Sequence, residues 1–233
     1  MKQILKWIEN FWYHHKLAAV IIVFAVVFLI IATVQTVSKD NADINILYAG
    51  PFWLSSAEIR GIESAFIQTM SEDYNGDGKN LVVIKDIILL SDVQIEERIE
   101  NAKAEGVTDL YINRNENLKL RNSLTTEIMG GESIICLLDP AWYEYVNAEN
   151  GFMPLVEILG YKPANAIDDY GIYLKDTEFG QFFTAFQALP EDTILCMRRM
   201  TVLSMFKGTK KEEERYNWHV RMFADILNFK VKE

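Results

Sequence analysis

Histidine and cysteine, which hold many catalytic and metal sites, are scarce in this chain. Its 233 residues contain three histidines and two cysteines. The patterns G-x-S-x-G, G-x-x-x-x-G-K-[ST], G-x-G-x-x-G, H-E-x-x-H and C-x-x-C do not occur in it. His219 is the only imidazole beyond residue 15, and we expect it on the exposed or half-buried side of the last helix. These absences disfavour a zinc site and predict a non-enzymatic protein, with a hydrolase as a weaker alternative.

Basic residues are also few relative to acidic ones. The chain has 23 Lys and Arg against 33 Asp and Glu, a formal net charge of −10. A nucleic-acid partner is therefore not expected, because phosphate binding needs clustered Lys and Arg. Residues 1–16 run against this trend, since Lys2, Lys6 and Lys16 face only Glu9 there.

A long apolar run follows that basic start. Residues 17–34 read LAAVIIVFAVVFLIIATV, and no charged residue occurs from position 17 to 38. Eighteen helical residues span roughly 27 Å, about one hydrocarbon core. A cleaved signal peptide and a buried helix of a soluble domain are alternatives. The length of the run and the lack of an A-x-A site favour a retained signal-anchor.

The positive flank then predicts the topology of the chain. We expect a cytoplasmic tail over residues 1–16, a transmembrane helix over 17–34, a linker over 35–43 and an extracytoplasmic domain over 44–233. The protein is thus predicted to be a single-pass protein of the cell membrane with its N-terminus in the cytoplasm.

Strand and helix patterns alternate beyond the linker. Apolar runs at 44–49, 81–90, 107–113 and 133–139 predict strands, with further strands at 171–174 and 193–200. Capping boxes at Ser55 and Ser91 open two helices, residues 120–128 form a third, and a box at 209–212 opens the last. A loop or short helix follows Pro140. The predicted fold is α/β, a mostly parallel sheet with helices on both faces.

The stretch SEDYNGDGKN, residues 71–80, resembles the first half of a calcium loop. Asp73, Asn75 and Asp77 occupy the first three ligand positions of an EF-hand, but the twelfth is Ile84, which cannot ligate. Asn-Gly and Asp-Gly pairs also form ordinary tight turns. Calcium and a plain turn therefore both remain open.

A ligand site is expected beyond the carboxyl ends of the strands, where open α/β sheets bind their ligands. The candidate residues there combine aromatic and polar side chains: Trp53, Ser55, Asn113, Arg114, Asp139 and Trp142. This combination suits a sugar, an amino acid or a peptide. Trp53 and Trp142 are equally well explained as packing aromatics. Cys136 and Cys196 both fall in predicted strands, where a disulfide and two free buried thiols are alternatives.

One segment carries a resemblance to a known family. LRNSLTTEIMGGESIICLLD, residues 120–139, is similar to the helix–glycine–strand segment of extracellular solute-binding proteins of ABC transporters. The layout, with ILYAG as first strand, looks like small membrane-anchored proteins of Gram-positive anaerobes that resemble one lobe of the type 2 periplasmic-binding fold. The resemblance implies binding of a small solute, or of a permease or other envelope partner. The alternative is a surface scaffolding or protein-interaction module with a vestigial cleft.

Overall fold

The computed structural model describes residues 21–22, 24–28, 42–107, 109–200 and 210–231. Contacts divide the chain into residues 1–41 and 42–233, and each unit is described by itself. The predicted tail, most of the predicted anchor and most of the linker lie outside the described residues. Residues 21–22 and 24–28 are helical. Across the described ranges, no helix combines the length and apolar character needed to cross a membrane.

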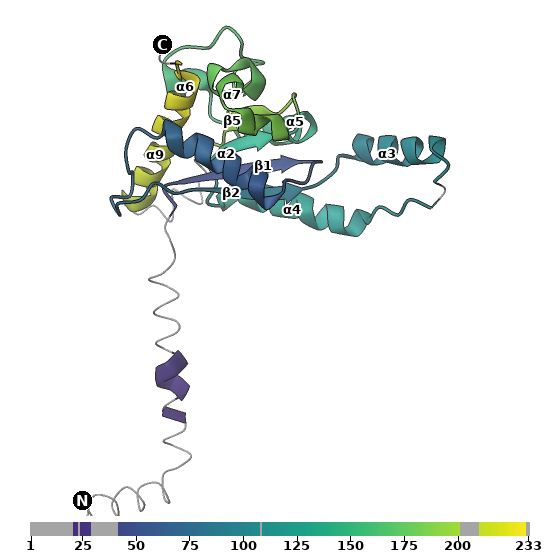
Figure 1. Ribbon diagram of the computed structural model, residues 1–233, viewed down its shortest axis with the longest axis horizontal. Helices are drawn as coiled ribbons and strands as arrows, with labels where there is room; N and C mark the ends of the chain where they lie inside the picture. Colours follow the sequence, from purple (N-terminus) through teal and green to yellow (C-terminus); the bar gives the residue numbers. More distant parts are fainter. Residues whose placement is uncertain (1–20, 23, 29–41, 108, 201–209, 232–233) are drawn as a thin grey trace, which may run out of the picture. The chain divides into compact units, whose positions relative to one another are not determined.

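A five-stranded sheet forms the centre of the second unit (Figure 1). Its strands are β1 (Ile44–Gly50), β2 (Val82–Ile88), β3 (Ile135–Leu138), β4 (Gly171–Tyr173) and β5 (Ile194–Met197). Their order is β2-β1-β3-β5-β4. β1 pairs in parallel with β2 and β3, whereas β5 is antiparallel to both β3 and β4. The α/β prediction is confirmed, but the sheet is mixed rather than mostly parallel.

Helices and short 3-10 turns surround the sheet. They are α2 (Ser56–Thr69), α3 (Asp92–Ala104), α4 (Arg114–Gly130), α5 (Pro140–Ala148), α6 (Leu155–Leu159), α7 (Glu178–Phe182), α9 (Lys210–Leu227), η1 (Leu174–Asp176) and η2 (Thr184–Ala188). The predicted boxes at Ser55 and Ser91 are both confirmed, because each serine and the residue three positions on exchange hydrogen bonds. The box predicted at 209–212 begins outside the described residues.

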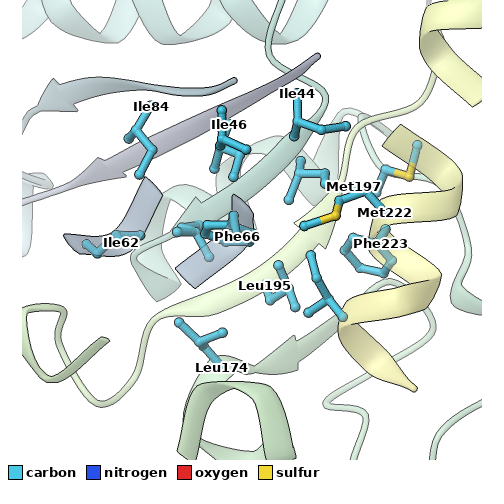
Figure 2. Close-up of a cluster of buried hydrophobic side chains, with 14 of the residues drawn as sticks. Ile44, Ile46, Ile62, Phe66, Ile84, Leu174, Leu195, Met197, Met222 and Phe223 are labelled. Carbon is cyan, nitrogen blue, oxygen red and sulfur yellow. The ribbon is translucent and has the colours of Figure 1, made fainter. Parts of the chain in front are cut away.

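One face of the sheet packs against α2 and α9. Ile46 and Ile84 meet Ile62 and Phe66 of α2, and Leu195 and Met197 meet Met222 and Phe223 of α9 (Figure 2). All of these side chains are buried. This layer is the larger of two hydrophobic clusters and closes one side of the sheet.

The opposite face packs against α4 and α5. Leu47, Cys136 and Cys196 point to this side, where Leu124 of α4 and Trp142 of α5 join them in one buried cluster. Strand residues on both faces are therefore apolar, as in a sheet covered by helices on both sides.

Two local predictions are wrong. Residues 107 and 109–113 form no strand; they lead into α4, with Val107, Leu110 and Tyr111 exposed. Composition suited a strand, but no strand among the described residues pairs with this segment. His219 is fully buried instead of exposed, because the buried stripe of α9 includes it together with Met222, Phe223 and Ile226.

α3, the segment after it and the start of α4 form a projecting hairpin, here named the arm (residues 91–107 and 109–121; Figure 1). α3 makes only sparse contact with other elements, and Ile95 is its one buried residue. Asn117 ties the base of the arm to the sheet, because its side-chain amide exchanges two hydrogen bonds with the backbone of Leu90, at 2.7 and 2.8 Å. The arm leaves the sheet at the carboxyl ends of the parallel strands.

Candidate functional site

The residues predicted to line a ligand site follow the carboxyl ends of the parallel strands or begin the helices there, but they do not form one group. Trp53 follows β1 and is 74% exposed. Ser55 caps α2, where its hydroxyl accepts a hydrogen bond from the backbone N–H of Glu58. Asn113 caps α4 in the same way, accepting from the N–H of Glu116 at 3.1 Å. Their side-chain oxygens thus serve helix ends.

Arg114 and Trp142 do come together, in a pocket at the base of the arm. This pocket, the edge pocket, has a volume of about 140 Å³. It is lined by Leu90, Asp92, Ile95, Arg114, Asn117, Leu118, Arg121 and Trp142. Three elements position these side chains: the end of the β2 segment with the first turn of α3, the first two turns of α4, and the start of α5.

Arginine is the main charged group of the edge pocket. The Arg121 guanidinium lies 4.7 Å from the ring centre of Tyr145 and 5.9 Å from that of Trp142, close enough for cation–π attraction. Among the described residues, neither Arg121 nor Arg114 forms an ion pair with a carboxylate. Two cations therefore share a small pocket whose only acidic lining residue is Asp92, which is itself exposed.

Trp142 forms the aromatic wall of the edge pocket and is otherwise part of the buried cluster below it. Its side chain is 4% exposed, and its indole Nε1–H is buried without a hydrogen-bond partner among the described residues. A buried unpaired donor is costly, and such groups are usually satisfied by water or by a ligand. The edge pocket thus joins two cations with the indole ring of Trp142, whose N–H is itself buried away from solvent.

Asp139 follows β3, is buried, and does not line the edge pocket. One carboxylate oxygen accepts from the N–H of Ala141 and the other from Nε2 of Gln94, both at 2.9 Å. Burial raises the pKa of Asp139 above its usual value, and the two hydrogen bonds only partly offset that effect. Its role is to cap α5 and to hold α3 against the sheet.

Arg121, Asn117 and Asp92 are site residues that the sequence analysis missed. Arg114, Asn117, Leu118 and Arg121 are spaced at three and four residues and therefore share one helical face. That spacing was available in the sequence, but it points to a pocket only once the strand end and α5 are placed beside α4.

Two larger hollows lie elsewhere in the unit. One, of about 280 Å³, lies between α7 and the C-terminal segment, and one of about 350 Å³ lies beside η2. The lysine that lines each is already paired with a carboxylate that lines the same hollow, Lys230 with Glu178 and Lys175 with Glu191. They therefore lack the uncompensated positive charge of the edge pocket.

The loop of Asp73, Asn75 and Asp77 folds around its own backbone. The Asp73 carboxylate accepts from the N–H groups of Gly76 and Gly78, at 2.8 and 2.6 Å. Asp77 accepts from the N–H of Lys79 at 2.9 Å. Gly76 and Gly78 have positive φ angles, which glycine adopts without strain. Within the described ranges, no group of three or more His, Cys, Asp or Glu side chains is placed to hold a metal ion.

The charged groups of the edge pocket are mainly hydrogen-bond donors. Guanidinium groups carry positive charge and donate hydrogen bonds in a planar fork, so the two arginines suit an oxyanion such as a carboxylate. Comparison with known proteins adds no relative: no family model, no curated protein and no solved structure matches the chain.

Proposed function

We propose that this chain is a non-enzymatic, membrane-anchored binding protein whose edge pocket takes a small anionic solute. The observation that carries the proposal is the pair Arg114 and Arg121, both without a carboxylate partner in the described residues, beside the ring of Trp142. The volume of about 140 Å³ limits the ligand to a few heavy atoms, or to one charged end of a larger molecule.

Membrane attachment and an extracytoplasmic domain belong to the same proposal. They rest on the apolar run at residues 17–34 and on the lysines before it. The solute-binding-like resemblance of residues 120–139 supports the same reading. A cysteine placed in the tail should resist a membrane-impermeant thiol reagent in intact cells. Labelling of this cysteine in intact cells would show that the tail lies outside the cell and that the proposed topology is wrong.

The pocket is tested by thermal unfolding of residues 42–233 with acetate, glycine, phosphate and a neutral sugar. A bound ligand at about 100 times its dissociation constant adds about 2.7 kcal/mol, or several degrees. We expect a shift with at least one anion and none with the sugar. Arg114→Gln and Arg121→Gln should each abolish the shift, whereas Arg60→Gln, an exposed arginine of α2, should keep it. An anion shift that survives both pocket variants would refute the site.

Partner binding is the second candidate function, and the arm favours it. Val107, Leu110 and Tyr111 are exposed there, and Leu118 at the base of the arm is 54% exposed. Apolar side chains gathered on one projecting element are typical of a protein interface. A permease or another envelope protein would be such a partner. A hydrolase has less support, because the described residues bring no acid–base pair into the edge pocket beyond Asp92 and the arginines.

A further inference from the structure

The arm is built as a helical hairpin with little to pack against. Ile95, Ile99 and Ala102 form the apolar stripe of α3, yet only Ile95 is buried. The segment that follows exposes Tyr111 at 83%. An amphipathic helix whose apolar stripe is only partly covered gains stability when a partner covers the rest.

The two helices of the arm carry opposite charge. α3 contains four acidic and two basic residues, a net of −2: Asp92, Glu96, Glu97 and Glu100 against Arg98 and Lys103. The first two turns of α4 contain three basic and one acidic residue, a net of +2: Arg114, Lys119 and Arg121 against Glu116. Within the described residues no ion pair joins α3 to α4. Lys119 pairs with Glu116 of its own helix at 3.5 Å, so the net charges of α3 and of the start of α4 are not matched by each other.

We propose that the arm docks on the arm of a second copy of this chain, with α3 of each copy lying against the start of α4 of the other. A two-fold axis makes the contact self-complementary, because the same acidic and basic surfaces meet twice. Two helical hairpins then form a four-helix arrangement, with Ile99, Leu110 and Leu118 facing inward. The inference names the partner for the second candidate function and does not depend on the edge pocket holding a ligand.

Charge selects this occupant over others. A nucleic acid or an anionic lipid surface would be repelled by α3 and by the net charge of −10. A strongly basic partner would match α3 but would leave the basic start of α4 unmatched. A second arm matches both helices. The exposed edge strand β2 is a poorer docking surface for another chain. The backbone N–H of Ile84 already donates to Glu63, and that of Leu90, just beyond β2, donates to Asn117.

A charge-exchange experiment on the full chain in detergent micelles tests the proposal. One variant carries Glu96→Lys and Glu100→Lys in α3; the other carries Arg114→Glu and Lys119→Glu in α4. Sedimentation velocity at protein concentrations of roughly 1 to 100 µM gives the oligomeric state. We expect the unmodified chain to dimerise, each variant alone to be monomeric, and an equimolar mixture of the two to dimerise again. Rising salt should weaken the dimer.

The matched control is Glu144→Lys, a charge reversal at an exposed position of α5, which should leave the dimer intact. A chain that stays monomeric over the whole range would overturn the proposal. So would dimers that persist in both arm variants, since the contact would then lie elsewhere. Neither result bears on the solute proposal, which is read separately from the anion-dependent thermal shift.

Discussion

The backbone N–H of Asn45 donates a hydrogen bond to Nε2 of His219 across 2.9 Å, joining the first strand to the last helix. The other ring nitrogen, Nδ1, lies 2.8 Å from the carbonyl oxygen of Arg215. Since Nε2 accepts, the ring proton sits on Nδ1 and the imidazole is neutral. Burial lowers the pKa of His219 to about 3, because the charged ring would lose its hydration and face nearby arginines.

This contact predicts a pH-dependent stability. Unfolded histidine titrates near pH 6.5, so between pH 6.5 and about 3 the unfolded chain binds a proton that the folded chain excludes. The stabilisation is complete above pH 6.5 and is lost progressively as the pH falls. Between pH 7.5 and 5.5 the free energy of unfolding should drop by about 1.4 kcal/mol from this residue. Urea unfolding of residues 42–233 at both pH values measures it.

His219→Gln is the matched variant, because glutamine offers an acceptor to Asn45 but cannot be protonated. Carboxylates contribute equally to both proteins and cancel in the comparison. We expect the variant to be less stable at pH 7.5 and to lose the difference of about 1.4 kcal/mol between the two pH values. An unchanged pH dependence would show that the ring is not excluded from protonation.

The sequence predicted correctly those features that depend only on residues close together in the chain. The serine boxes at Ser55 and Ser91 begin helices because donor and acceptor lie three residues apart. The strand prediction for residues 107–113 was wrong because a strand needs a pairing partner distant in the sequence, which composition does not reveal. The predicted exposure of His219 was wrong because the angle at which a helix docks decides which of its side chains are buried. The edge pocket needed three separate elements to be placed, so only Arg114 and Trp142 were found beforehand.

A buried guanidinium gives the second prediction. Arg198 is 4% exposed, and its Nε and Nη2 donate at 2.6 Å to the carbonyl oxygens of Ser133 and Gly131, just beyond the end of α4. Burial lowers the pKa of Arg198 from its usual value, because the charged guanidinium loses hydration. Arg198→Met should cost about 3 kcal/mol, because two buried carbonyls lose their donors. Guanidinium chloride unfolding measures the change.

Its neighbour Arg199 serves as the control. Arg199 is exposed, and its side chain makes one longer hydrogen bond, from Nε to the carbonyl oxygen of Phe152 at 3.3 Å. Arg199→Met should cost under about 1 kcal/mol. Equal losses in the two variants would mean that Arg198 does not anchor the end of α4.

Variants in the loop at residues 73–78 distinguish a plain turn from a calcium site. As a turn, Asp73→Ala should cost about 1 kcal/mol by releasing two backbone N–H groups, and Asp77→Ala should cost less because it releases one. Both losses should be the same in calcium and in EDTA. A rise of several degrees in the melting temperature with calcium, abolished by Asp73→Ala, would instead establish the calcium proposal.

The two cysteines give the last prediction. Cys136 and Cys196 are directly opposite in the antiparallel pair β3–β5, and both are free and buried. Burial, with the neighbouring Cys136, raises the pKa of the Cys196 thiol well above its usual value, which disfavours the reactive thiolate. We expect folded residues 42–233 to resist alkylation and to take up two alkyl groups per chain in guanidinium chloride without reductant. A single-cysteine variant, Cys196→Ser, calibrates the yield at one group. If the unfolded chain took up label only after reduction, a disulfide would link these strands in the isolated protein.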